Sequence, residues 1–383
     1  MPGRIRIAHS RQADAAAAVQ EFYDGVAQSP MELVVFFCSS DYDLDVIATE
    51  LCRHFVGVPI VGCTTAGEIG PAGYSSRGIS GASFPSDGFS GVSALLQPLQ
   101  GCDIESGRHF AENLMRRLEA ADPAATADNS FGFLLIDGLS AREEAITLTL
   151  QNALGRISMV GGSAGDDLKF QRTWIFHDGA FHTDCAALML LSTRYPFRTF
   201  KTQHFVSMDE RIVVTAADAE RRVVKEINGL PAAEEYARLI GVPTDQLAPS
   251  HFAANPVVVR INGMDYVRSI QQANADGSLT FYCAIDEGVV FRLAQGKDLI
   301  RNLKQTFDGL REEIGKPQAV FACDCVLRNL EISQNEQKAM VGELLRRNNT
   351  VGFSTYGEQY AGVHVNQTFT GIAIGEGESG EPA

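Results

Sequence analysis

Three segments of the chain are almost continuously apolar: LVVFFC at Leu33–Cys38, FGFLLI at Phe131–Ile136 and AVFAC at Ala319–Cys323. Runs of this kind are typical of strands that are buried on both faces. Each run is followed by a stretch with apolar residues at helical spacing, which predicts an amphipathic helix. A serine three positions before an acid predicts the N-cap of each helix, at Ser40-Asp43, Ser140-Glu143 and Ser333-Glu336.

A short motif follows each predicted helix: VGCTTAGE at Val61–Glu68, VGGSAGD at Val160–Asp166 and VGFSTYGE at Val351–Glu358. Asp87-Gly88 and Asp178-Gly179 then predict two-residue turns of β-hairpins after the first two copies. Three copies in the same order indicate an internal duplication of a β-α-β-hairpin unit.

Residues 211–317, between the second and third copies, match neither copy and have their own strand and helix patterns. Asn228-Gly229 predicts a turn, and Pro231 predicts the start of a helix that runs through Leu239. The apolar spacing of Asp298–Ile314 predicts a long amphipathic helix. We therefore expect an α/β fold of mixed sheets from three repeated β-α-β-hairpin units, with an inserted α+β region before the third. Residues 376–383 (EGESGEPA) are expected to be a disordered tail.

Composition narrows the class of protein. The chain has 383 residues, with 32 Lys and Arg against 47 Asp and Glu, a net charge of −15 that argues against a nucleic-acid partner. No apolar run reaches the ~20 residues of a membrane span, and the first residues lack the apolar core of a signal peptide. The expectation is a cytoplasmic protein without membrane insertion. Its eight cysteines, with no CxxC, do not indicate a disulfide scaffold.

The repeated motifs are the first candidate ligand site. Ligands of parallel α/β sheets often bind beyond the carboxyl ends of the strands, and motif glycines allow positive φ and close turns. Alternatively, the motifs are turns that each repeat needs to fold. The candidate binding residues are Thr64, Thr65, Gly67, Ser163, Gly165, Asp166, Ser354, Thr355, Gly357 and Glu358.

The motif blocks VGCTTAGEI, VGGSAGDDLKFQRTWIFHDG and GFSTYGEQY, together with VHVNQTFTG and EINGLPAAEEYARLIG, resemble the FIST family of bacterial sensory proteins. The resemblance implies a FIST N-terminal sensory domain with two repeats at residues 31–210. It implies a C-terminal domain, with the insert and the third repeat, at residues 211–375.

Within the family, the segments SAGDDLKFQRTW, KTQHFVS, INGMDYVRSI and FACDCVLRN resemble the nitric-oxide-sensing (NosP-type) branch. That resemblance implies a signal-transduction sensor, not an enzyme, that binds haem b and detects nitric oxide. Its implied partner is a histidine kinase or a cyclic-di-GMP synthase or phosphodiesterase.

A b-type haem needs an axial ligand, and the chain lacks the CxxCH of covalent attachment. His204 is the first candidate, because it lies in a block that carries the branch resemblance. His177 and His182, diagonal across the Asp178-Gly179 turn, and His364 in GVHVNQTFTG are the alternatives. Each of them is also open to a purely structural role.

Two other functions stay open. One is a sensor of a non-haem small molecule such as an amino acid, bound at the motif loops. The other is a cysteine-dependent enzyme or redox site. Cys38 and Cys323 end strands just before predicted helices, whose amides lower a thiol pKa, and Cys325 follows Cys323 two positions later. The chain has no GxSxG, HExxH, P-loop or GxGxxG-plus-acid unit.

Overall fold

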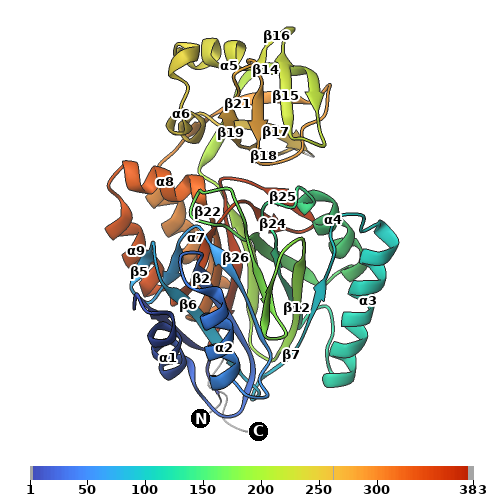
Figure 1. Cartoon of the computed structure of the whole chain (residues 1–383), viewed down its shortest axis with the longest axis vertical. Helices are drawn as coiled ribbons and strands as arrows, with labels where there is room; N and C mark the ends of the chain where they lie inside the picture. Colours follow the sequence, from blue (N-terminus) through green and yellow to red (C-terminus); the bar gives the residue numbers. More distant parts are fainter. Residues whose placement is uncertain (1–2, 262, 378–383) are drawn as a thin grey trace.

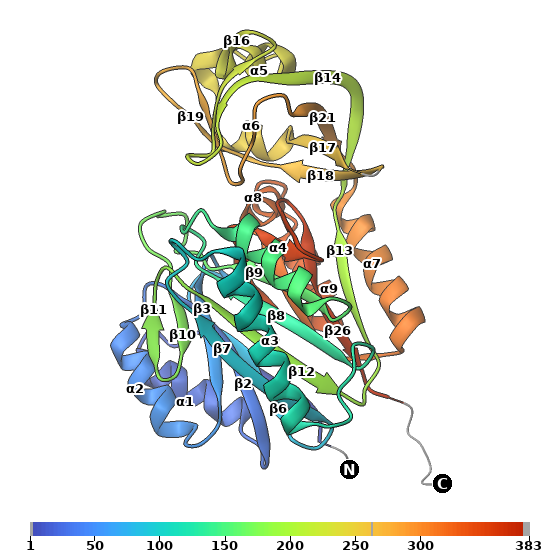
Figure 2. The ribbon, with the colours of Figure 1, turned by 90° about the vertical axis from the view of Figure 1, so that its right-hand side faces the viewer.

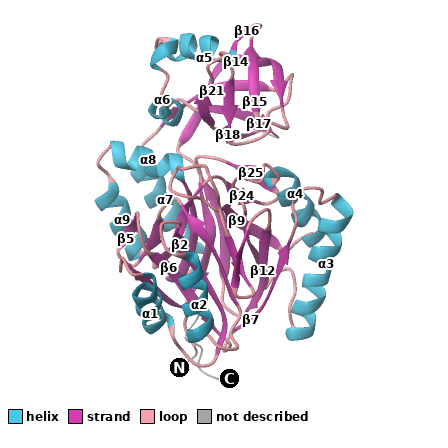
Figure 3. Cartoon of the chain, viewed as in Figure 1, coloured by secondary structure: helices cyan, strands magenta, loops and turns pink. Residues whose placement is uncertain are grey.

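The computed structural model of the chain describes residues 3–261 and 263–377. Within these residues the strands form three six-stranded sheets and one eight-stranded sheet, and helices cover the outer faces of the six-stranded sheets (Figure 3). The three smaller sheets share one central core and form a body that we call the ring (residues 3–202 and 299–377). The eight-stranded sheet belongs to a second body, the insert (residues 205–296), which lies on one end of the ring (Figures 1 and 2).

The ring consists of three repeats of one unit, which confirms the predicted duplication and the α/β class. The first repeat contains β1 (Arg6–Ser10), α1 (Ala15–Val26), β2 (Met31–Ser39), α2 (Leu44–His54), β3 (Ile60–Thr65), β4 (Glu68–Gly70), β5 (Gly73–Ser75) and β6 (Ile79–Pro85). The second contains β7 (Phe89–Leu96), α3 (Ile104–Ala121), β8 (Ser130–Ile136), α4 (Glu143–Leu154), β9 (Ser158–Ser163), β10 (Ile175–His177), β11 (Ala180–His182) and β12 (Ala186–Thr193). The third contains β13 (Phe197–Thr202) and, after the insert, α7 (Leu299–Ile314), β22 (Pro317–Cys325), α8 (Val326–Gln334), α9 (Lys338–Arg347), β23 (Thr350–Thr355), β24 (Glu358–Tyr360), β25 (Val363–Val365) and β26 (Phe369–Gly375).

The repeats interlock through their short hairpins. In each repeat the apolar strand pairs in parallel with the strand that carries the motif: β2 with β3, β8 with β9 and β22 with β23. The following hairpin leaves its own sheet and joins the next one. Hairpin β4–β5 joins β23, β10–β11 joins β3, and β24–β25 joins β9. Every sheet therefore contains strands of two repeats, and the three motif loops are held together at the centre.

The predicted apolar strands are buried on both faces because they separate two cores. Their inner side chains meet in the ring's central core, where Phe84 stacks on Phe321 and Phe37 on Phe353, with ring centroids 5.0 Å and 4.7 Å apart. Their outer side chains pack against the amphipathic helices. No helix in the described part of the chain is long and apolar enough to cross a bilayer.

The insert has its own hydrophobic core and its own mixed set of elements. These are β14 (Phe205–Asp218), β15 (Val223–Ile227), β16 (Leu230–Pro231), α5 (Ala232–Ile240), the short 3₁₀ helix η1 (Thr244–Gln246), α6 (Pro249–Ala254), β17 (Val257–Ile261), β18 (Met264–Arg268), β19 (Ile270–Ala273), β20 (Leu279–Phe281) and β21 (Val290–Gly296). The chain passes from the ring to the insert at residues 203–204 and returns at residues 297–298. These two crossings lie side by side and are joined by a hydrogen bond from the Lys297 amide to the His204 carbonyl, at 2.7 Å. The insert is shorter than the predicted 211–317, since α7 packs on the ring.

The structure corrects two local predictions. Asp87-Gly88 is a turn but not a hairpin, because β6 pairs with β2 and β7 pairs with β12 of a different sheet. The predicted serine caps are also wrong: Asp43 caps α2, α4 has no side-chain cap, and Ser333 lies inside α8. The Asp178-Gly179 hairpin is confirmed with the expected pairing of Ile175 with His182. Most of the predicted disordered tail, residues 378–383, lies outside the described residues.

Candidate functional site

The three motif loops meet in a closed cycle of backbone hydrogen bonds. The amides of Ala66, Gly165 and Tyr356 occupy corresponding positions, and each donates to a carbonyl of another repeat. The bonds are Ala66 to Ser354 at 3.0 Å, Gly165 to Thr64 at 3.0 Å, and Tyr356 to Ser163 at 3.2 Å. The structure therefore brings together the three loops that carry the ten candidate residues.

The polar side chains of the motifs are buried and have partners within the protein. Thr64 accepts from the Trp174 amide, Thr65 donates to Glu68, Ser163 accepts from Gln359, Ser354 accepts from Asn329, and Thr355 donates to Glu358. The Asp166 carboxylate accepts from the Tyr356 hydroxyl and from the amides of residues 170–172. These contacts hold the loops to one another and fold the segment after Asp166.

The motif glycines serve two different purposes. Gly67 has φ of 129°, as expected for a residue at a position that favours glycine. Gly165 and Gly357 are absent from the positive-φ residues, so their predicted conformational role is wrong. A Cβ on Gly165 would lie 2.8 Å from the Ala66 amide nitrogen, and one on Gly357 would lie 2.2 Å from Cε1 of His364. Both glycines therefore allow a close approach.

Gly165→Ala is expected to lower the free energy of unfolding by about 1–3 kcal/mol, because the new methyl meets backbone that cannot move aside. Gly309→Ala is the matched control. It lies in α7 with no atom within 4 Å of its Cβ position, so it should stabilise the protein by about 0.5–1 kcal/mol. Urea unfolding of both variants measures the difference. Equal effects would contradict the close approach of the loops.

Two motif acids, Glu68 and Glu358, take the same position in the first and third repeats and are fully buried. Burial raises the pKa of each carboxyl to about 8. Glu358 accepts from the amide and hydroxyl of Thr368 at 3.1 Å and 2.6 Å. In the first repeat the position of Thr368 is occupied by Gly78, which has no side chain to donate. Oε2 of Glu68 therefore has no hydrogen-bond partner among the described residues.

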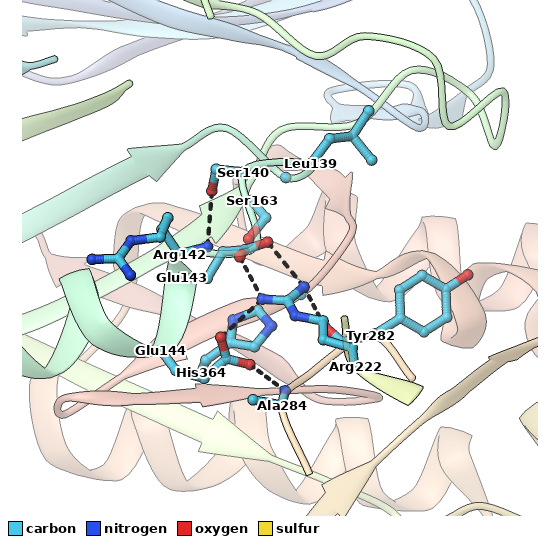
Figure 4. A network of polar contacts seen from close by, with 12 residues as sticks. Leu139, Ser140, Arg142, Glu143, Glu144, Ser163, Arg222, Tyr282, Ala284 and His364 are labelled. Carbon is cyan, nitrogen blue, oxygen red and sulfur yellow. Dashed lines mark hydrogen bonds and ion pairs between the residues drawn. The ribbon is translucent and has the colours of Figure 1, made fainter. Parts of the chain in front are cut away.

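The insert is fastened to the ring by a buried ion-pair network (Figure 4). Arg222 of the insert contacts Glu143 and Glu144 of α4 at 2.6 Å and 2.8 Å, and it donates to the Tyr282 carbonyl at 2.9 Å. Burial opposes the charge of Arg222, but the two carboxylates outweigh it and raise the Arg222 pKa. Its φ of 57° is unusual for a residue with a long side chain and marks a backbone held in place by its surroundings.

Three further buried side-chain atoms, in β24, β25 and the segment that follows, have no hydrogen-bond partner among the described residues. They are Nε2 of His364, Nδ2 of Asn366 and Oε1 of Gln359. Nε2 of His364 and Nδ2 of Asn366 lie 2.6 Å and 3.2 Å from the same point, the Cβ position of Gly357. Burial lowers the pKa of His364, which favours the neutral imidazole. We call His364, Asn366 and Gln359 the junction cluster.

Sequence reasoning identified His364 but missed the residues around it. Glu143 was expected to serve a helix cap and instead pairs with Arg222. Nothing in the local pattern of Arg222 points to a partner in α4, because the two segments meet only through the fold. Asn366 follows His364 in the VHVNQTFTG block, and that block was the available signal.

His204 is not placed as an axial ligand requires. Its Nε2 lies 3.0 Å from both carboxylate oxygens of Glu331, and its Nδ1 lies 3.0 Å from Nη1 of Arg328. Arg328 also pairs with Asp324, which binds the Tyr74 hydroxyl. Both imidazole nitrogens thus have partners, and burial lowers the His204 pKa. The residues around His204 do not fit haem, and they instead fasten the crossing between ring and insert to α8.

His204→Phe is expected to lower the free energy of unfolding by about 2–3 kcal/mol, because it keeps most of the volume but leaves Arg328 and Glu331 without this partner. His109→Phe, on the exposed side of α3, should change it by less than about 0.5 kcal/mol. Chemical unfolding of the two variants measures the contrast. A His204 variant as stable as the wild type would contradict the fastening role.

The other candidates have local partners as well. Nε2 of His177 lies 3.2 Å from the Ser93 hydroxyl, and Nε2 of His182 lies 3.2 Å from the His177 carbonyl. No group of three or more His, Cys, Asp or Glu side chains that could hold a metal ion occurs within the described ranges. Burial raises the pKa of the Cys38, Cys323 and Cys325 thiols well above its usual range, so the predicted lowering by helix amides is wrong.

Comparison with known proteins gives matches over most of the chain. Family models of the FIST N domain and the FIST C domain match residues 32–230 and 232–361, whereas the sequence predicted a boundary at 210. An uncharacterised protein of Methanocaldococcus jannaschii, MJ1623, is 24% identical over 303 residues, which cover 70% of this chain and 58% of that protein. The chain thus spans less than two thirds of that relative.

Among solved structures, a cyanuric acid hydrolase from A. caulinodans is similar at 9% identity with a TM-score of 0.37. The match covers 98% of this chain and 100% of the hydrolase. A second cyanuric acid hydrolase structure is similar at 11% identity with a TM-score of 0.35, over the same shares of the two chains.

Proposed function

The chain belongs to the FIST family, whose domains are sensory domains of signal-transduction proteins, and from that premise we propose that it binds a small non-haem molecule at the junction of ring and insert. The observation that carries the proposal is the junction cluster. Buried polar groups normally have hydrogen-bond partners, so a group without one calls for an explanation such as a bound molecule or water. His364, one of the three, lies beside Glu144 of the ion pairs that fasten the insert (Figure 4).

The junction also supports a route for the signal. The insert is joined to the ring by two crossings that lie side by side, so it can tilt as one body about them. A ligand shifts such an equilibrium only if it interacts differently with the two positions. A molecule bound between the two bodies meets this condition, because its contacts change when the insert moves. The proposed output is a surface change that a histidine kinase or a cyclic-di-GMP enzyme reads.

The proposal is for a sensor and not for an enzyme. The raised pKa of the buried thiols is the opposite of what an activated cysteine nucleophile needs. The cytoplasm, where these signalling partners reside, is the proposed location.

A thermal-shift screen against a panel of small metabolites tests the function. The wild type and His364→Phe are screened in parallel, and His109→Phe serves as the control for loss of a histidine. We expect at least one compound that raises the Tm of the wild type and of His109→Phe but not of His364→Phe. Compounds that stabilise all three proteins equally would contradict a ligand site at the junction.

Haem b with nitric oxide as the signal is a second proposal, supported by the sequence blocks of the nitric-oxide-sensing branch. The contacts of His204 do not favour it, whereas Nε2 of His364 has no partner in the part of the chain described. Haem would supply an iron that binds nitric oxide. If haem is the ligand, hemin should give a sharp Soret band that shifts on reduction and with nitric oxide, and that His364→Ala removes. A broad band of loosely bound hemin would contradict it.

A further inference from the structure

Two arginines face each other across neighbouring strands of the insert. Arg211 of β14 lies directly opposite Arg292 of β21 in an antiparallel pairing, in the body at the top of Figure 1. Like charges in this arrangement destabilise a sheet. The ion pairs in the described part of the insert involve Arg222, Arg238 and Arg260. Neither Arg211 nor Arg292 takes part in one, so the described chain leaves their repulsion without a neutralising carboxylate.

The contacts of the two arginines leave room for a group from outside the chain. Nη1 of Arg292 donates to the carbonyls of Met208 and Asp209, both at 3.1 Å, which holds its guanidinium against the bulge of β14. Arg211 is exposed, and the exposed acids Asp209 and Glu210 form no ion pair with either arginine within the described ranges. Directly opposite side chains start about 5 Å apart, so one carboxylate can contact both guanidinium groups.

An exposed apolar pair lies beside the two arginines. Val213 and Val290 oppose each other two positions along the same strands, so they lie on the same face of the sheet as the arginines. They are 38% and 44% exposed, whereas the intervening pair, Ile212 and Phe291, is buried in the core of the insert. Arginine beside apolar side chains is typical of the centre of a protein–protein interface. We call Arg211, Arg292, Val213 and Val290 the arginine face.

We propose that the arginine face docks a segment of a partner protein in which an acidic side chain adjoins an apolar one. The carboxylate contacts both guanidinium groups, and the apolar side chain covers Val213 and Val290. The chain has a net charge of −15, so an acidic partner is repelled on average and the unneutralised arginines determine where it binds. The inference goes beyond the proposed function, because this docking needs no ligand at the junction. Since β14 begins directly after the first crossing, the docked segment moves with the insert.

The test measures binding of rhodamine-labelled peptides to the full chain by fluorescence polarisation. The probe is the synthetic peptide GELEELEG, and the comparison is GQLQQLQG, which keeps the leucines and the length but has no charged side chain. The acidic peptide is expected to bind at least about tenfold more tightly. Arg211→Glu should weaken its binding at least about tenfold. Arg221→Glu makes the same charge change in the exposed turn after β14 and should bind the peptide like the wild type.

Arg211→Glu also tests the repulsion between the two arginines. A glutamate opposite Arg292 turns a like-charged pair into an attractive one, so the urea midpoint of unfolding should rise above that of the wild type while peptide binding falls. Arg221→Glu should leave the midpoint unchanged. A rise in stability also shows that the loss of binding does not come from a misfolded variant.

Equal affinities for the two peptides, or no binding of the acidic one, would overturn the inference. Arg211→Glu that binds the acidic peptide as tightly as the wild type does, or that unfolds at a lower urea midpoint, would also overturn it. Tighter binding of a short oligothymidylate than of the acidic peptide would overturn it as well, because the arginines would then select phosphates and not a protein segment.

Discussion

Replacing Arg222 with alanine is expected to lower the free energy of unfolding by about 3–5 kcal/mol, since it leaves two carboxylates of the ring without their counter-ion. Glu143 is 1% exposed and Arg222 is 12% exposed, so water compensates little of the loss. The insert should also loosen before the ring unfolds, because Arg222 ties Tyr282 of the insert to α4. Urea unfolding followed by fluorescence, together with limited proteolysis, measures both effects.

Arg221→Ala is the matched control for Arg222. Arg221 is the exposed neighbour in sequence and carries the same charge, so its removal should cost less than about 0.5 kcal/mol. Arg222→Lys should fall between the two, because one ammonium group cannot reproduce the separate contacts of the two guanidinium nitrogens. If Arg222→Ala and Arg221→Ala unfold alike, the network does not fasten the insert.

Glu68→Gln is expected to make the protein more stable than the wild type above pH 8. The folded pKa of Glu68 is about 8 against an ordinary value of 4.5. The folded state therefore binds the proton more tightly than the unfolded chain, and the contribution of Glu68 to wild-type stability falls as the pH rises from 4.5 to 8. The loss from this one group is on the order of 4 kcal/mol. Glutamine keeps an acceptor for Thr65 and carries no charge.

Unfolding free energies from pH 4.5 to 9 test this prediction. The free energy of unfolding of Glu68→Gln minus that of the wild type should rise from pH 4.5 to 8, because Glu358 and the histidines with lowered pKa change both proteins alike. Glu234→Gln, an exposed acid of α5, should follow the wild-type curve. If the free energies of unfolding of Glu68→Gln and the wild type change equally with pH, the Glu68 carboxyl ionises as easily in the folded protein as in the unfolded chain, which would contradict the prediction.

The repeats could be predicted from the sequence because each one carries its own signal. The runs at Leu33–Cys38, Phe131–Ile136 and Ala319–Cys323 are apolar on both faces since both faces are buried, and the motif strands follow at similar distances. The exchange of hairpins between sheets could not be predicted. The turn at Asp178-Gly179 has the same local chemistry whether the hairpin joins its own sheet or, as observed, β3 of another repeat.

The candidate site could be predicted only in part for the same reason. His364 lies in a block with a family resemblance, and the motifs stood out as candidate binding loops, but their meeting at one place could not be predicted. Arg222 and Glu143 are 79 positions apart, and neither stands out until the fold places them together. His204 was chosen for its sequence block, but its partners Glu331 and Arg328 come from α8, whose position relative to β13 has no local signal.

The central claim is that a ligand at the junction sets the position of the insert. A pulsed electron–electron resonance experiment tests it most directly, with spin labels at exposed Leu148 of α4 and exposed Ala275 of the insert, and with Cys52 and Cys102 replaced by serine. The account predicts that a compound from the thermal-shift screen changes the distribution of distances between the two labels in the wild type. His364→Phe should give the same distribution with and without the compound. A distribution that the compound leaves unchanged in the wild type would contradict the account.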